Sequence, residues 1–88
     1  MSHASNKDLT NRLKRAHGHL AKITAMVAED RDALDIAQQL QAVISALENA
    51  KTFLVAHHIE HHLEETMGTL SPETRDNLAR LTTLAKYL

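Results

Sequence analysis

The chain has 88 residues, a formal net charge of -1 at pH 7, 43% hydrophobic residues and no cysteine. This length predicts a single domain over residues 1–88, and the hydrophobic content excludes a disordered chain. The absence of cysteine excludes disulfides, thiolate catalysis and sulfur-ligated metal sites. No apolar run approaches the roughly 18 residues of a membrane span and no signal-peptide pattern is present, so the sequence predicts a cytoplasmic protein without a membrane partner.

Residues 7–29 form the first predicted helix. Its apolar residues alternate at spacings of four and three, the period of an amphipathic helix; they are Leu9, Leu13, Ala16, Leu20, Ile23 and Val27. Between residues 7 and 22 the segment carries five basic residues and one acid, a net charge of +4, while the rest of the chain sums to -5. Such a basic face is either solvated or binds an anion, and both interpretations stay open.

Residues 33–66 form a much longer second helix, with Asp32 as its predicted N-cap. A second apolar seam repeats the same spacings, through Ile36, Leu40, Val43, Leu47, Ala50 and Leu54. At 1.5 Å per residue this helix would be about 50 Å long, more than the first helix can cover. The short connection at residues 29–32, "EDRD", predicts an antiparallel hairpin.

A short third helix follows the segment "LSPET" at residues 70–74, with Ser71 as N-cap and Pro72 at the first helical position. The predicted fold class is therefore all-α. Three helices of such unequal length cannot enclose a self-sufficient core, and the end of the second helix from Leu54 to His61 has no predicted partner within the chain. The sequence therefore predicts an obligate oligomer, at least a dimer.

Four of the seven histidines lie in "HHIEHH", residues 57–62. His57 and His61 continue the apolar seam, and His58 and His62 lie beside it. Each pair four residues apart places two imidazoles on one helix face, as in helices that hold zinc. Two ligands do not complete a site, so the others must come from another helix, another subunit or the N-terminus, where His3 is a candidate. The histidines are otherwise interface and solvated side chains, or a pH switch.

Three segments together carry a family resemblance: "NRLKRAHGHLAKITAMV" (11–27), "ALDIAQQLQAV" (33–43) and "HHIEHHLEE" (57–65). From about residue 7 to residue 88 the chain resembles the CsoR/RcnR family of bacterial repressors, especially its nickel-resistance-associated members. The resemblance implies an antiparallel, all-helical dimer that assembles into a tetramer. It also implies binding to operator DNA and release of that DNA when an effector binds.

The resemblance assigns the metal-ligand positions late in the second helix to His58 and His62, the pair of nickel and cobalt sensors. His3 matches an N-terminal histidine of that branch, and His61 is a further candidate ligand. The family's first ligand, a cysteine at the start of the second helix, is replaced by Ala33. A site without a thiolate suits Ni(II), Co(II), Zn(II) or Cu(II), and the Irving–Williams order predicts that Cu(II) binds best in vitro.

The resemblance also implies a DNA-binding face. Its predicted residues are basic and lie mainly on the first helix: Lys7, Arg12, Lys14, Arg15 and, on the second helix, Lys51. An arginine that relatives often carry midway along the second helix is Asn49 here, and Lys86, near the C-terminus, is expected to contribute little. No helix-turn-helix recognition helix is visible, so we expect recognition through DNA shape and backbone contacts.

The sequence thus predicts a metal-responsive transcriptional repressor, not an enzyme, with operator DNA and further copies of itself as partners. The alternative is a family member that has lost metal sensing, DNA binding or both, and acts as a helical interaction protein or responds to another effector. Ala33 and Asn49 are the residues that favour this alternative.

Overall fold

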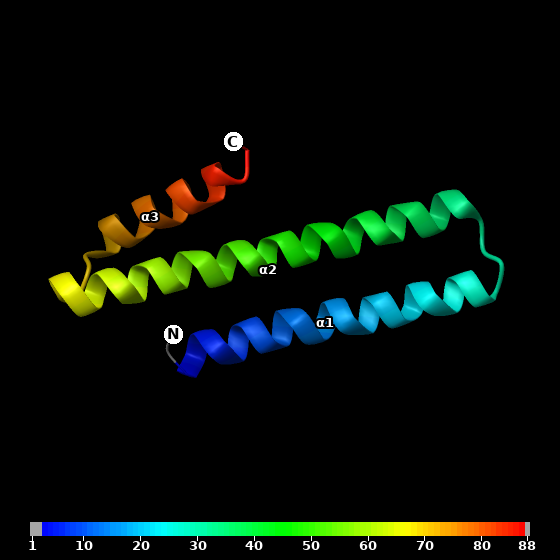
Figure 1. Ribbon diagram of the computed structural model, residues 1–88, viewed down its shortest axis with the longest axis horizontal. Coiled ribbons are helices and arrows are strands. Elements are labelled where there is room, and N and C mark those ends of the chain that lie inside the picture. The colour runs from blue at the N-terminus through cyan, green and yellow to red at the C-terminus, as the bar shows by residue number, and fades with distance from the viewer. Residues whose placement is uncertain (1–2, 88) are drawn as a thin grey trace.

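The computed structural model describes residues 3–87, and the side chains of residues 6–87. Three helices follow one another: α1 (His3–Ala28), α2 (Ala33–Met67) and α3 (Pro72–Ala85). α1 and α2 form an antiparallel hairpin, and α3 folds back along the other side of α2, so that the helices form one flat layer (Figure 1) of 55 × 29 × 15 Å. The prediction of an all-helical, three-helix chain is confirmed. Within the described chain, no helix has both the length and the apolar character needed to cross a membrane.

The turn between α1 and α2 closes with two backbone hydrogen bonds. The N–H of Arg31 donates to the carbonyl of Met26 at 3.0 Å, and the N–H of Asp30 donates to that of Val27 at 3.2 Å. Asp30 has a φ of 54°, a left-handed conformation that aspartate adopts more readily than most residues, and the pattern is a Schellman cap. Asp32 occupies the N-cap position of α2 as predicted, but its side chain makes no capping hydrogen bond.

The turn between α2 and α3 depends on a glycine and a serine cap. Gly68 has a φ of 84°, and its N–H donates to the carbonyl of Glu64 at 2.9 Å, which ends α2. The Ser71 hydroxyl accepts the backbone N–H of Thr74 at 3.1 Å, and Pro72 occupies the first turn of α3. The predicted cap at Ser71 is confirmed.

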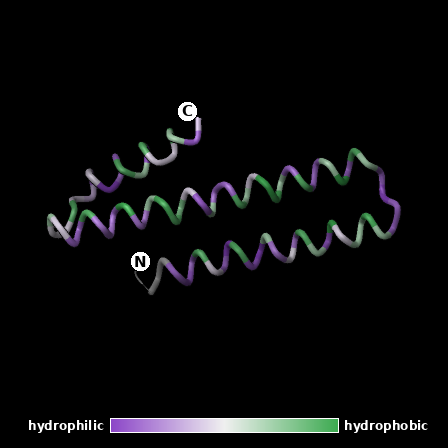
Figure 2. Tube along the Cα trace, in the orientation of Figure 1, coloured by the Kyte–Doolittle hydropathy of each residue, from purple (hydrophilic) through white to green (hydrophobic). Residues whose placement is uncertain are grey.

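The predicted apolar seams are only partly buried. The buried residues are Ala16, Ile23, Val43, Ala50 and Leu70. Hydrophobic residues recur along both α1 and α2 (Figure 2), but the seam members between the buried ones stay 39–57% exposed: Leu13, Leu20, Val27, Leu40, Leu47 and Leu54. An amphipathic helix has an apolar stripe more than 100° wide, and a single neighbouring helix covers only the part that faces it. Each stripe therefore keeps an exposed half.

The prediction that the Leu54-to-His61 end of α2 has no partner within the chain is wrong in part. α3 packs back along this end, because Ser71 and Pro72 restart the helix directly after the turn at Gly68 (Figure 1). The covering is one-sided, since Leu54, Val55 and Ile59 remain 38–43% exposed.

Candidate functional site

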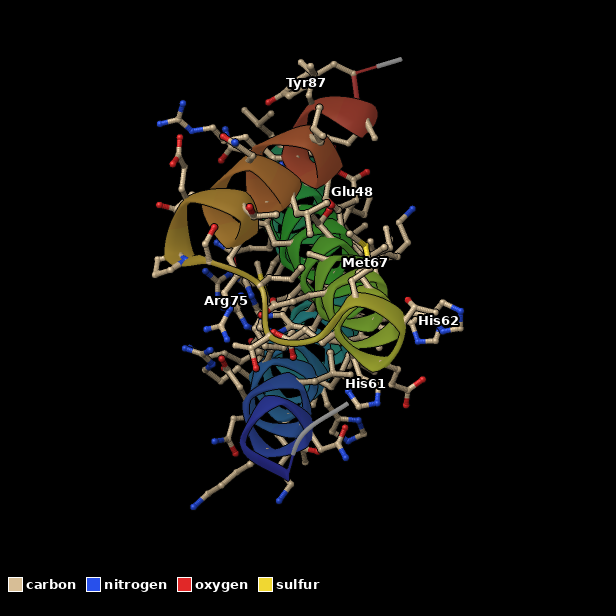
Figure 3. The ribbon with its side chains drawn as sticks, turned by 90° about the vertical axis from the view of Figure 1, so that its left-hand side faces the viewer. Glu48, His61, His62, Met67, Arg75 and Tyr87 are labelled. Carbon is tan, nitrogen blue, oxygen red and sulfur yellow. The ribbon has the colours of Figure 1, made fainter. Side chains whose placement is uncertain are left out.

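The flat layer has two broad faces that carry different side chains. Viewed along the helices, Arg75 lies on one side of the layer and His62 on the other (Figure 3). We call the side with Arg12, Arg15, Asn49 and Arg75 the arginine face, and the side with Leu47, His58 and His62 the histidine face. His58 follows Leu47 by 11 residues, about three turns of helix, so both lie on one row of α2. The exposed apolar row of α2 therefore leads directly to the histidines.

His58 and His62 are exposed, and their rings stack with centroids 6.1 Å apart. A divalent metal such as zinc holds histidine nitrogens at about 2.0–2.1 Å, so both rings must rotate toward a common ion to share it. Among the side chains of residues 6–87, no three His, Asp or Glu gather where they could hold a metal ion. One chain thus offers two imidazole donors, which suit a divalent transition metal, and the set is incomplete without further ligands.

The other two histidines of the segment differ from each other. His57 is half-buried, with its ring centroid 4.2 Å from that of Phe53, and its Nδ1 lies 3.9 Å from Glu60 Oε2. His61 is exposed, and its Nε2 lies 3.0 Å from Glu65 Oε1. His57 therefore packs against Phe53, whereas His61 within one chain pairs with a carboxylate one helical turn further along.

His3 and Ala33 lie at very different distances from this segment along the fold. His3 is the first residue of α1, and its side chain lies outside the described ones. Arg12 contacts Phe53 across the antiparallel hairpin, so His3, nine residues earlier, comes level with the histidine segment of α2. Ala33 begins α2, and at 1.5 Å per residue roughly 37 Å separate it from His58. Within one chain, the start of α1 therefore lies level with the histidine segment, and the start of α2 does not.

The arginine face contains a cationic cleft of about 280 Å³ between α1 and α2. It is lined by Arg12, Arg15, Ala16, His19, Ala46 and Asn49. The Nε of Arg12 is buried and lies 3.4 Å from Asp8 Oδ1, an ion-pair distance without hydrogen-bond geometry. The Arg12 guanidinium carbon lies 4.6 Å from the centroid of the Phe53 ring. Arg12 is therefore held in place at the edge of a cleft that an anion could enter.

The structure separates the other predicted DNA-binding residues from this cleft. Lys14 precedes the buried Ala16 by two residues, about 200° around the helix, so it lies on the side of α1 away from α2. Lys7 is seven residues earlier on the same row as Lys14. Lys51 does not line this cleft; it lines a second hollow beside the end of α3, together with Asn49 and Lys86. Of the predicted set, only Arg12 and Arg15 line one cleft.

Two residues beside the cleft were missed by sequence reasoning. Lys86 Nζ lies 3.5 Å from Asn49 Oδ1, so the residue that was expected to contribute little to DNA binding lies beside the cleft. The length of α3 could have predicted this contact, because a helix of 14 residues that folds back from Gly68 ends near the middle of α2. Phe53 is the only phenylalanine and lies four residues before His57, one turn away on the same side of the helix.

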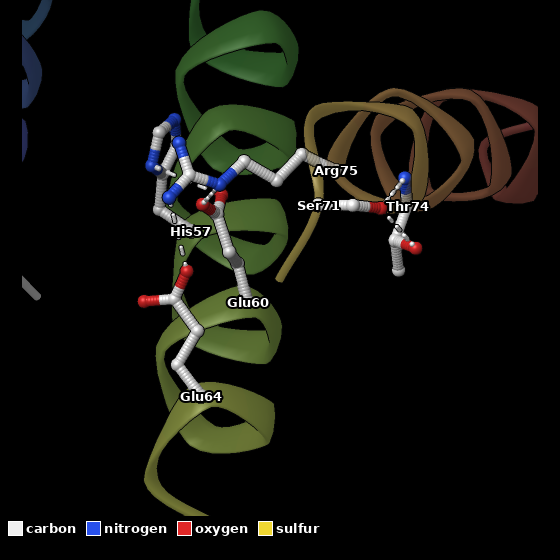
Figure 4. A network of polar contacts seen from close by, with 6 residues as sticks. All are labelled: His57, Glu60, Glu64, Ser71, Thr74 and Arg75. Atoms are coloured by element: carbon white, nitrogen blue, oxygen red, sulfur yellow. Dashed lines mark hydrogen bonds and ion pairs between the residues drawn. The ribbon is translucent and has the colours of Figure 1, made fainter. Parts of the chain in front are cut away.

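A polar network attaches α3 to the histidine end of α2 (Figure 4). Arg75 Nε lies 3.1 Å from Glu60 Oε1, and Arg75 Nη2 lies 3.3 Å from Glu64 Oε1. Glu60 in turn lies within 3.9 Å of His57. With the Arg12–Phe53 and Phe53–His57 contacts, side chains of all three helices meet around one segment of α2.

Comparison with known proteins places these features in a family. A family model described as metal-sensitive transcriptional repressor matches residues 5–86. The copper-sensing transcriptional repressor CsoR of Bacillus subtilis (strain 168) is 39% identical over 64 residues, which cover 69% of this chain and 63% of that protein. CsoR of Mycobacterium ulcerans is 44% identical over 50 residues (57% and 43%), and the copper-sensing repressor RicR of Mycobacterium tuberculosis is 31% identical over 68 residues (77% and 71%).

The match spans less than two thirds of the length of these CsoR relatives. No solved structure gives a significant match. The family consists of transcriptional repressors, in agreement with the prediction of a protein that is not an enzyme. Because the family model covers almost the whole sequence, the chain belongs to the family of metal-sensitive transcriptional repressors.

Proposed function

We propose that this protein is a repressor that binds operator DNA and releases it when a divalent transition metal binds. The observation that carries the proposal is the pair His58 and His62, on one row of α2, in a chain that matches the metal-sensitive repressor family over residues 5–86. The family match does not favour the alternative of an interaction protein without sensing.

The metal site we propose is built from imidazoles. His58 and His62 supply two nitrogen donors, and His3 and His61 are the candidates for further ligands. The relatives are copper-sensing by name, but this chain has no cysteine. Cu(I) prefers soft sulfur ligands, so the donor set favours Ni(II), Co(II), Zn(II) or Cu(II). A bound ion would fix the two histidine rings, which are exposed in the chain alone.

The proposed metal site also involves a second copy of the chain. The histidine face carries a row of apolar side chains that stay 39–47% exposed: Leu40, Ile44, Leu47, Leu54 and Val55. Only five apolar residues are buried in the described chain, a small core for its length. We infer that this row packs against the same row of a partner in an antiparallel dimer that pairs into a tetramer. Ligands from the partner can then reach His58 and His62.

The DNA contacts we propose start from the arginine face. Arg12 and Arg15 line the cationic cleft, and Lys7, Lys14 and Lys51 supply charge on other rows. A tetramer presents four copies of the basic segment at residues 7–22, so it offers several phosphate contacts although each chain has a net charge of -1. Neutralised phosphates then provide most of the affinity, which makes binding salt-dependent.

Fluorescence anisotropy with labelled DNA from upstream of the protein's own gene tests the DNA half of the proposal. We expect the metal-free protein to bind this duplex at low salt, with an affinity that falls steeply as salt rises. Absence of binding at low salt would refute it.

Isothermal titration with Ni(II) tests the metal half. We expect His58→Ala and His62→Ala each to weaken binding at least tenfold, because each removes one nitrogen ligand. His57→Ala is the matched control, since His57 packs on Phe53 and lies on a different row. If His57→Ala abolishes binding in a folded protein while the other two variants bind normally, the ligand assignment is wrong.

A further inference from the structure

Phe53 lies between Arg12, which lines the cationic cleft, and His57, the first residue of the histidine segment of α2. It is half-buried in α2, with the Arg12 guanidinium 4.6 Å from its ring centroid and the His57 ring 4.2 Å from it. An arginine over an aromatic ring is attracted by the ring's negative face, and the attraction grows when the contact is shielded from water. Arg12 is shielded in part, because its Nε is buried while its side chain as a whole is 36% exposed.

Two neighbours restrict the position of Arg12. The ring of Phe53 contacts the guanidinium, and the carboxylate of Asp8, one turn earlier on α1, lies 3.4 Å from the Arg12 Nε. Arg12 also lines the 280 Å³ cleft with Arg15 and Asn49, so the restrained guanidinium borders the space that an anion would occupy. Asp8 is acidic and weakens the positive potential around Arg12 locally.

We propose that Phe53 is a positioning residue that orients Arg12 to contact a phosphate of the DNA backbone in this cleft. The inference rests on the proposed DNA binding and names a residue through which that binding works. A planar guanidinium matches a phosphate with two parallel hydrogen bonds, but only when its orientation is correct. A side chain already held in that orientation loses less conformational entropy when DNA binds.

The test is a series of DNA dissociation constants measured at several salt concentrations. Phe53→Leu keeps an apolar side chain but removes the ring, and we expect it to weaken binding about three- to tenfold and to reduce the salt dependence. Phe53→Tyr keeps the ring and should bind like the wild type. Circular dichroism and light scattering check the fold and assembly of each variant, and Phe53→Met replaces Phe53→Leu if the latter does not fold.

A double-mutant cycle separates positioning from packing. If Phe53 acts through Arg12, adding Phe53→Leu to Arg12→Ala should cause no further loss of DNA affinity. An equal loss in both backgrounds, or wild-type affinity for the folded Phe53→Leu variant, would overturn the inference while leaving the proposed function intact. Failure of the wild type itself to bind DNA would instead overturn the proposed function and this inference with it.

Discussion

Leu47→Ala distinguishes a folded single chain from an assembly that covers the histidine face. Leu47 is 44% exposed within the chain, whereas Ile23, on α1, is 3% exposed. Complete burial of a leucine side chain contributes about 1.5–3 kcal/mol, and truncation of a buried Leu or Ile to Ala costs about 2–5 kcal/mol because a cavity remains. In a single chain, the half-covered Leu47 should therefore lose only about 1 kcal/mol of unfolding free energy.

If a partner covers the row, Leu47 becomes a buried residue in the assembly. Leu47→Ala should then cost about 3 kcal/mol, similar to Ile23→Ala, which is buried with or without a partner. Leu34→Ala is the control, because Leu34 is 63% exposed and its position on α2 points away from the Leu47 row. Its substitution should change stability by about 0.5 kcal/mol or less.

The assay is urea unfolding followed by circular dichroism, at one fixed chain concentration because assembly makes stability concentration-dependent. Light scattering gives the molar mass of each variant. A loss of about 1 kcal/mol or less for Leu47→Ala, with a wild-type mass of 9.8 kDa, would refute the inferred interface.

Three further predictions concern single residues. Arg75→Ala should lower the unfolding free energy by about 1 kcal/mol, because it breaks two partly exposed ion pairs. A double-mutant cycle with Glu60→Gln, measured by urea unfolding, should show that the two substitutions are coupled. Additive losses of unfolding free energy would contradict this prediction. Arg15→Ala and Lys14→Ala should each weaken DNA binding by a similar factor on any sequence and reduce the salt slope, whereas Arg80→Ala on α3 should do little; equal losses for all three would count against a face on α1. Roughly 37 Å separate Ala33 from His58 within one chain, so only an antiparallel partner can bring the two positions together. In that arrangement, Ala33→Cys should tighten Ni(II) binding in isothermal titration. An unchanged affinity would contradict the arrangement.

Local sequence signals predicted the helices well. The four-and-three spacing identified both long helices, and Ser71 with Pro72 identified the start of α3, because caps and periodicity depend on near neighbours in sequence. The extent of burial was less predictable. Spacing defines an apolar stripe on a helix, but it does not say which half of that stripe the next helix covers, so Leu47 and Val43 looked equivalent in the sequence and differ in the structure.

The candidate site was harder to predict, because it depends on where separate helices meet. The sequence placed Arg12, Lys14 and Arg15 in one basic cluster, but their positions around α1 put Lys14 on the far side from the cleft. The approach of Lys86 to Asn49 follows from the direction of α3, which no local pattern encodes. The pairing of His58 with His62 did follow from spacing alone, since residues four apart share a helix face.

Addition of metal to a preformed protein–DNA complex tests the central claim most directly. Labelled operator DNA is saturated with the wild-type protein or with the double variant His58→Ala/His62→Ala, and Ni(II), Co(II), Zn(II) and Cu(II) are titrated in separately. Our account predicts that at least one metal lowers the anisotropy of the wild-type complex to that of free DNA while the double variant stays bound. Metals that bind the wild-type protein without releasing its DNA, or that release the double variant equally well, would contradict the account.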